Sequence, residues 1–352
     1  MEKGAMNVNE NRLGRRTLLF PSAPSVLGFA SAAGKKEGEG PLSAFFDYVD
    51  KDDTFGENSW EKSETALQQR AIRTALSKAN RTPEELQLLF AGDLLNQCIG
   101  SSYAARGIAA PFLGLYGACS TMAESLLLSA MAVDGGYAAL AAAAASSHFC
   151  TAERQYRTPL EYGGQRTPTA QWTVTGAGAV LLGPDGPGPY VTCATVGIVQ
   201  DKGIQDANNM GAAMAPAAYD TLKSHFADTG LSPFDYDLIV TGDLGSLGMG
   251  IVADFFRKDG RPLGDTYQDC GVLIFDPEKQ DVHCGGSGCG CSASVLGGYL
   301  LRGMRAGRWN RVLFCGTGAL HSPVSVQQGE SIPGICHAVV LQTARPAPGA
   351  FR

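Results

Sequence analysis

The chain of 352 residues is 44% hydrophobic, which is enough for two domains or for one large α/β unit with a substantial core. Its net charge of −6 and the absence of a long basic run argue against nucleic acid as a partner. Ten cysteines are too few for a disulfide scaffold at this length and indicate a reducing compartment.

The amino-terminal segment carries two competing patterns. Residues 1–14 are polar, and we expect them to form a disordered tail. Arg15-Arg16 and the apolar residues after it are similar to a twin-arginine or secretory signal. Two prolines interrupt that apolar run, so we favour an extended lead-in and a first strand over residues 26–33. No apolar stretch reaches about 18 residues, so the sequence predicts no transmembrane segment.

The next elements follow in a recognisable order. Residues 34–60 are polar and glycine-rich, which predicts a long surface loop with little regular structure. Apolar residues at helical spacing predict a helix over residues 63–79. Thr82-Pro83 then opens another turn, and a short buried strand over residues 86–91 ends at Gly92-Asp93-Leu94.

A single cysteine follows the next apolar run. Residues 112–116 break at Gly117, present Cys119 and pass into a helical pattern over residues 122–133. Free N–H groups and the helix dipole at such a helix start favour a thiolate, lowering a thiol pKa of about 8.5. Strand, turn, cysteine and buried helix together are typical of an acyl-accepting nucleophile. The alternative is a buried cysteine that packs as a small hydrophobic residue.

The downstream sequence repeats this order. A helix over residues 215–229 leads to Ser232-Pro233, a strand over residues 238–241 and Gly242-Asp243-Leu244. Gly117-Ala118-Cys119 matches Gly286-Ser287-Gly288, and each precedes a small-residue helix and an apolar strand. The remaining matched pairs are residues 122–133 with 292–305, 140–145 with 312–315, and 175–182 with 333–341. We interpret these matches as a duplication.

The duplication decides the interpretation of one ambiguous segment. Residues 138–145 are nearly polyalanine, and helix propensity alone predicts a helix. Their match to the strand over residues 312–315 instead predicts a central strand. Alternating strands and helices predict mostly parallel sheets covered by helices, in a first half over residues 15–185 and a second half over residues 186–352. The equivalent loops are then expected to meet at a pocket between the halves.

The duplication with a cysteine before the buried helix resembles the thiolase and ketoacyl synthase superfamily. Within it, several strings resemble the stage V sporulation protein AD family: Gly92-Asp93-Leu94-Leu95-Asn96-Gln97 and residues 114–121, 146–149, 152–157 and 171–176. The similarity extends over about residues 26–341. It implies an α/β thiolase-like fold, in which duplicated βαβαβ halves form a five-layered αβαβα sandwich. It also implies a spore-forming source and a role in moving dipicolinic acid (pyridine-2,6-dicarboxylate), with its calcium, into the developing spore.

The chain departs from the enzymes of that superfamily. Ketoacyl synthases need a second-half histidine, and a further histidine or asparagine, to activate the cysteine and to stabilise an oxyanion. At the matching positions the chain has Asp243 and a loop containing Gly286 and Ser287. A carboxylate near Cys119 would raise its pKa. The resemblance therefore implies non-catalytic binding of dipicolinic acid or its calcium complex, with no catalytic residues. An acyl transferase or condensing enzyme using Cys119 as nucleophile is the alternative.

Further candidates come from residues near the expected pocket. His148 follows the strand over residues 140–145, with a structural histidine as the alternative. Arginine presents the forked donors that a dicarboxylate needs, although surface ion pairing is the default for such residues. The expected ligand-binding set is Cys119, His148, Arg154, Arg157, Arg166, Asp243, Gly286 and Ser287.

We expect no cofactor and no metal site, because His283, Cys284, Cys289 and Cys291 do not follow a usual zinc spacing. The resemblance implies a homodimer paired through edge strands of the first half. It also implies contacts with other stage V sporulation membrane proteins. These contacts would hold a cytoplasmic or forespore protein peripherally at the spore inner membrane.

Overall fold

The computed structural model describes residues 11–156 and 166–346, so the candidate Arg157 lies outside the described residues. The expected disordered tail is wrong in its last part, because β1 (Arg12–Leu13) pairs with β2 (Thr17–Leu19), which in turn pairs with β10 (Tyr190–Thr195). The predicted first strand is confirmed as β3 (Ser25–Ala33).

One sheet path passes through both halves, and its strand order repeats. In the first half the order is β3, β9 (Gly176–Gly183), β7 (Ala141–Ser147), β5 (Leu88–Gly92) and β6 (Phe112–Gly114). In the second half it is β10, β15 (Gly334–Gln342), β14 (Arg311–Ala319), β11 (Leu238–Thr241) and β12 (Tyr267–Asp269). In each half the first two pairings are antiparallel and the last two are parallel. The sheets are therefore mixed and not mostly parallel.

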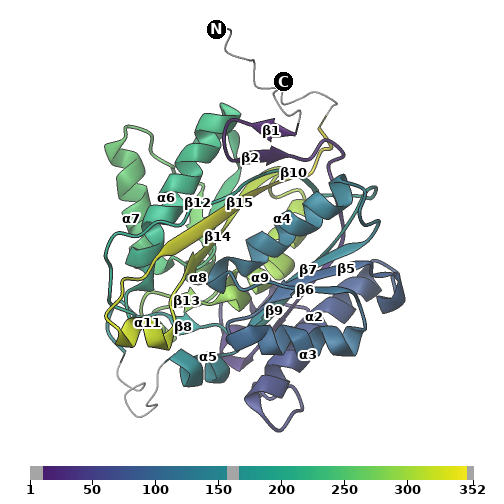
Figure 1. The fold of residues 1–352 in the computed structure, drawn as a ribbon, viewed down its shortest axis with the longest axis horizontal. Helices are drawn as coiled ribbons and strands as arrows, with labels where there is room; N and C mark the ends of the chain where they lie inside the picture. The colour runs from purple at the N-terminus through teal and green to yellow at the C-terminus, as the bar shows by residue number, and fades with distance from the viewer. Residues whose placement is uncertain (1–10, 157–165, 347–352) are drawn as a thin grey trace.

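Helices form three layers around these strands (Figure 1). The outer face of the first-half strands is covered by α2 (Trp60–Lys78) and α3 (Ile99–Ile108). The outer face of the second-half strands is covered by α6 (Met210–Thr229) and α7 (Gly245–Lys258). Between the two sets of strands lie α4 (Thr121–Asp134) and α9 (Cys289–Val295), which contact strands and each other. The predicted αβαβα sandwich is confirmed.

The polyalanine segment forms a strand, as the duplication predicts. All seven residues of β7 are buried between β9 and β5. Small side chains allow the central helix α9 to approach closely, and a Cβ atom at Gly290 would lie 2.6 Å from the backbone nitrogen of Ser147. Packing against both sheets and helices therefore outweighs the helix propensity of alanine.

Other local predictions need correction. Residues 34–60 contain α1 (Lys35–Gly38) and β4 (Tyr48–Val49), and Glu37 is buried, so this stretch is not simply a surface loop. The helix α6 begins five residues before the expected start and contains Pro216. The expected helix over residues 292–305 is divided into α9, a π-helical turn (Leu296–Leu300) and α10 (Leu301–Arg305).

The remaining elements are short. They are η1 (Ser43–Phe45), η2 (Pro83–Glu85), η3 (Asn96–Cys98), η4 (Ala118–Ser120), α5 (Phe149–Tyr156), β8 (Trp172–Thr173), η6 (Pro233–Asp235), α8 (Cys270–Leu273), β13 (Gly286–Ser287) and α11 (Pro323–Gln327). Within the described residues, the helices are all too short or too polar to cross a membrane.

Candidate ligand pocket between the halves

A cavity of about 200 Å³ lies where loops of the two halves meet. Its lining residues are Leu94, Ala118, Cys119, Ala152, Glu153, Tyr156, Thr173, Ala207, Asn208, Met210, Ser287, Ala319 and His321. Residues up to Thr173 come from the first half, and the others come from the second. The described lining contains no lysine or arginine.

Cys119 lies at the start of the central helix. It belongs to η4, two residues before α4 begins. The turn is fixed by local hydrogen bonds, since the Ser120 hydroxyl donates to the Gly117 carbonyl at 2.7 Å and the Thr121 hydroxyl to the Ala118 carbonyl at 2.7 Å. The predicted position of Cys119 at a helix start is therefore confirmed.

The predicted lowering of the Cys119 pKa by the helix start is wrong, whereas the predicted raising by a nearby carboxylate is confirmed. Burial raises the pKa of this thiol well above its usual range, and the adjacent Asp243 raises it further. Only a backbone hydrogen bond from Gly288 acts in the opposite direction. Loss of water and a neighbouring carboxylate therefore outweigh the helix dipole, and Cys119 remains a thiol.

Asp243 lies behind the cavity wall and not on it. Its carboxylate accepts from the Gly288 backbone N–H at 2.9 Å and from the Thr317 hydroxyl at 2.8 Å, and it hydrogen-bonds Cys119. Burial raises its pKa to about 7. The Ser287 hydroxyl, which does line the cavity, is 3.4 Å from the same carboxylate.

Ser287 and Gly286 form β13, which precedes α9 as η4 precedes α4. Ser287 lies two residues before α9, so it is placed like Cys119 before α4. Gly286 does not line the cavity; a Cβ atom there would lie 2.9 Å from the Ile274 side chain, so close packing accounts for this glycine. Its carbonyl accepts from the Gln171 amide at 2.8 Å.

His148 is buried away from the cavity. Its Nε2 atom lies 2.9 Å from the Asp53 carbonyl, and its Nδ1 atom accepts from the Cys150 N–H at 3.2 Å. Burial lowers the pKa of this imidazole. These partners fit one neutral tautomer, and they support the structural alternative for His148.

Arg154 and Arg166, the two candidate arginines among the described residues, also lie outside the cavity lining. Arg154 forms an ion pair with Glu61 on α2. Arg166 pairs with Asp281 at 2.7 Å, and its guanidinium lies 4.8 Å from the centre of the Trp172 ring. The structure therefore brings together Cys119, Ser287 and, behind them, Asp243, but it does not bring His148, Arg154 or Arg166 to the cavity.

Five polar or aromatic lining residues are absent from the expected set: Glu153, Tyr156, Thr173, Asn208 and His321. Tyr156 donates to the Leu94 carbonyl at 2.7 Å, and its ring centre lies 5.5 Å from that of His321. Ala152, Glu153 and Tyr156 share one face of α5, a helical spacing visible in the sequence. Asn208 and His321 come from irregular loops, for which the sequence offers no comparable pattern.

Comparison with known proteins identifies the family of this chain. The family model described as stage V sporulation protein AD matches residues 14–342. The chain is also 47% identical over 331 residues to a protein of Bacillus subtilis (strain 168) named stage V sporulation protein AD, covering 94% of this chain and 98% of that protein. The chain belongs to the stage V sporulation protein AD family. Its membership connects the chain to sporulation.

Solved structures outside the family share the fold. The 3-oxoacyl-[acyl-carrier-protein] synthase III of Aquifex aeolicus VF5 superposes with a TM-score of 0.54 at 14% identity, covering 91% of this chain and 99% of that chain. A variant of the OleA protein of Xanthomonas campestris superposes with a TM-score of 0.55 at 14% identity, covering 94% of this chain and 99% of that chain. At this identity the likeness establishes the thiolase-like fold alone.

In this member of the stage V sporulation protein AD family, the Asp243 carboxylate lies against the Cys119 thiol, and His321 lines the same cavity. Burial and the adjacent Asp243 carboxylate both raise the pKa of this thiol and so favour its protonated form. What the lining offers is a set of hydroxyl, amide and thiol groups beside the rings of Tyr156 and His321. Such walls suit binding of a small planar molecule.

Proposed function

We propose that the chain binds dipicolinate, free or as its calcium complex, in the cavity between the halves and releases it chemically unchanged. The observation that carries this proposal is the contact of the Cys119 thiol with the Asp243 carboxylate, which together with burial raises the pKa of the thiol. A thiol with a raised pKa is a poor nucleophile, but it can still serve as a polar group in the cavity lining. The role proposed is uptake of this ligand into the developing spore.

The size and lining of the cavity support a small aromatic ligand. A volume of about 200 Å³ is below the usual range for drug-sized ligands, so a one-ring molecule is favoured over a long acyl chain. The rings of Tyr156 and His321 give such a ligand apolar faces, and Ser287, Thr173 and Asn208 provide hydrogen-bond donors to its carboxylates.

Isothermal titration calorimetry of the full chain with dipicolinate, with and without calcium, tests this proposal. We expect saturable binding of dipicolinate and weaker binding of benzoate, which has one ring and one carboxylate. Absence of heat with both dipicolinate forms, or equal binding of benzoate, would overturn the proposal.

The alternative, an acyl transferase that uses Cys119, makes a different prediction. Incubation with acetyl-CoA followed by intact-mass measurement should leave the chain unmodified if the thiol is only part of a wall. A stoichiometric acetyl adduct mapped to Cys119 would favour the enzyme instead.

We further propose a homodimer paired through the edge strand β6. This strand has no second neighbour among the described strands, and its Leu113 side chain is 50% exposed; Tyr116, two residues beyond the strand, is 52% exposed. An exposed apolar edge strand is open to pairing with a second copy. Sedimentation showing a monomer at micromolar concentration would contradict this homodimer.

We also propose that stage V sporulation membrane proteins hold the chain peripherally at the spore inner membrane.

A further inference from the structure

The duplication offers an internal control for surface features. The short turns η2 and η6 occupy equivalent places after the outer helices α2 and α6, and both begin with a capping box. Thr82-Pro83-Glu84 therefore matches Ser232-Pro233-Phe234 residue by residue. Glu84 is exposed, as a charged side chain normally is. Phe234, at the same position of the second half, exposes 75% of its surface to water.

Phe234 stands at the rim of a hollow of about 820 Å³. The hollow lies between the carboxyl-terminal ends of α6 and α7. The rings of Phe226 and Phe256, 6.0 Å apart, face it, together with Leu231 and Pro262. A large apolar side chain exposed beside a hollow with aromatic walls is a feature of docking surfaces and not of isolated surface residues.

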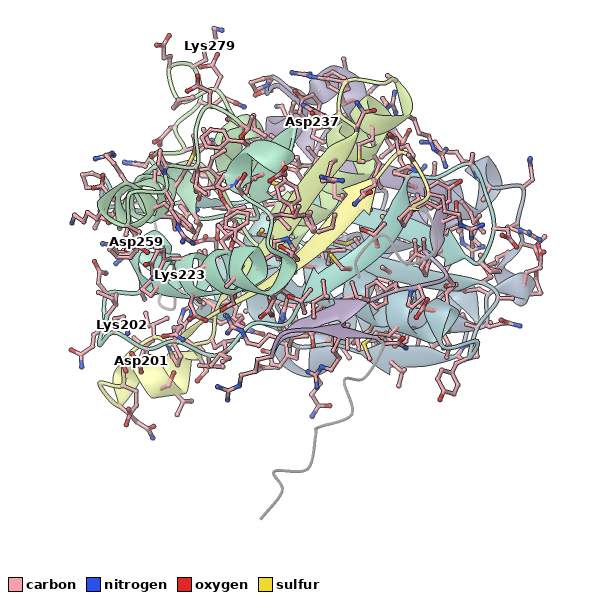
Figure 2. All side chains as sticks on the ribbon, turned by 90° about the horizontal axis from the view of Figure 1, so that it is seen from above. Asp201, Lys202, Lys223, Asp237, Asp259 and Lys279 are labelled. Carbon is pink, nitrogen blue, oxygen red and sulfur yellow. The ribbon has the colours of Figure 1, made fainter. Side chains whose placement is uncertain are left out.

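A second hollow of about 450 Å³ continues along the same two helices. Asp259 borders both hollows, and Lys223 and the Tyr219 hydroxyl both contact its carboxylate, Lys223 at 2.8 Å. Figure 2 shows Lys202, Lys223 and Asp259 along one edge of the molecule, on the side of α6 and α7. We name these two hollows and the bridge between them the α6–α7 groove.

The uncompensated charge of the groove is positive. Of the two carboxylates that line the groove, Asp220 pairs with Arg16 and Asp259 pairs with Lys223. Lys202, Lys258 and Arg261 are exposed and form no ion pair in the described part of the chain. This basic rim contrasts with the net charge of −6 of the whole chain. An occupant therefore needs apolar side chains for the hollows and carboxylates for the rim.

We propose that the α6–α7 groove docks an amphipathic segment of a protein partner, with apolar side chains in the two hollows and acidic residues against Lys258 and Arg261. Concave hollows with aromatic walls fit individual side chains, which a flat lipid surface does not provide. This surface is separate from the ligand cavity and from the edge strand β6, and the inference does not depend on the proposed ligand.

Photocrosslinking in sporulating cells tests the occupant. The photoreactive residue p-benzoylphenylalanine replaces Phe234 in the full chain, and a matched variant carries it at Glu84, the equivalent position of the first half. We expect an adduct at position 234 and not at position 84, and peptide sequencing should map it to a segment with apolar and acidic residues. No adduct at position 234, equal adducts at both positions, a lipid adduct, an adduct with a second copy of the chain, or a partner segment without acidic residues would each overturn the proposal.

Binding of a synthetic peptide with the mapped sequence then measures the contribution of each contact. Phe234→Glu makes the turn resemble its first-half equivalent and should weaken binding by roughly tenfold or more, as for a central aromatic anchor. Arg261→Glu should weaken it several-fold, and lysine in place of the peptide's acidic residue should restore binding to this variant. Both side chains are exposed, so unchanged melting temperatures serve as the folding control. Unchanged affinity in both variants would overturn the proposal.

Discussion

The two Gly-Asp-Leu turns have the same sequence and face in different directions. Asp93, after β5, accepts from the backbone N–H groups of Leu95 at 2.8 Å and Ser101 at 2.7 Å, so it stabilises the start of α3 in its own half. Asp243, after β11, accepts instead from Gly288 and Thr317 at the interface between the halves. Asp93 therefore stabilises a local turn, whereas its equivalent Asp243 contacts Cys119 from behind the cavity lining.

A second carboxylate explains the difference. Asp269, at the end of β12, accepts from the N–H groups of Leu244 at 2.9 Å and Gly245 at 3.0 Å. It therefore stabilises the start of α7, as Asp93 stabilises the start of α3. By strand register, the first-half equivalent of Asp269 is Gly114, which has no side chain to offer. Because Asp269 satisfies the turn, Asp243 is available to contact Cys119.

The largest expected effect comes from filling the cavity with a larger side chain at Cys119, the lining residue that Asp243 contacts. Cys119→Leu should weaken dipicolinate binding by roughly a hundredfold, because overfilling a closed wall forces neighbouring side chains to move. Cys119→Ser should keep affinity within about fivefold, since the hydroxyl is smaller and still donates a hydrogen bond. Calorimetric titration of both variants measures the contrast.

The folding control for this pair is the melting temperature of each variant without ligand. An equal loss of affinity in correctly folded Cys119→Leu and Cys119→Ser would contradict a binding wall. It would instead indicate that the thiol itself is required, as in an enzyme.

The difference between the two turns can be tested on the reactivity of Cys119. Asp243→Asn removes the carboxylate beside the thiol, so its pKa should fall and alkylation by iodoacetamide at pH 8 should accelerate by roughly tenfold. Asp93→Asn is the matched control, because Asp93 is not among the groups that shift the Cys119 pKa. Peptide mapping assigns the modified cysteine. Equal acceleration in both variants would show that loosening of the fold, and not charge, exposes the thiol.

The raised pKa of Asp243 also predicts a pH dependence of stability. Its pKa rises from 3.8 to about 7 on folding, so the folded state holds the proton more tightly. The stabilising contribution is complete below about pH 4 and is lost as pH rises toward 7, with a slope of up to about 1.4 kcal/mol per pH unit. Asp243→Asn should flatten the free energy of unfolding against pH in this window, measured by urea denaturation.

An exposed carboxylate provides the opposite sign for comparison. The Ser331 hydroxyl and the Gly203 N–H lower the pKa of Asp201, so its contribution is present above its ordinary pKa and is lost as pH falls. Asp201→Asn should therefore lower stability at neutral pH and change the slope of the curve only at acidic pH, with the opposite sign to Asp243→Asn. A curve for Asp243→Asn that runs parallel to the wild type would contradict the raised pKa.

The duplication made most of the fold predictable from sequence. It identified β7 as a strand despite its alanines, and it placed Cys119 and Ser287 before the two central helices. It could not reveal which way Asp243 faces, because that depends on Asp269, a residue outside the repeated motif. The lining residues Asn208 and His321 lie in loops whose conformation depends on contacts distant in sequence. The sequence could not place Arg154 and Arg166 outside the cavity lining, because composition alone cannot distinguish an ion pair such as Arg154 with Glu61 from a ligand contact.

The smallest expected effect separates two neighbouring residues of α5. Arg154 pairs with Glu61 outside the cavity, so Arg154→Ala should leave dipicolinate affinity within about twofold of the wild type, as removal of a surface ion pair usually does. Glu153 lines the cavity, and Glu153→Gln removes a carboxylate that would repel a dianion. It should strengthen binding of free dipicolinate several-fold, with a smaller change for the uncharged calcium complex. A large loss of dipicolinate affinity in Arg154→Ala, with no change in Glu153→Gln, would indicate that the ligand binds on the outer face of α5 and not in the cavity. Only a ligand outside the cavity wall could contact Arg154 and not Glu153.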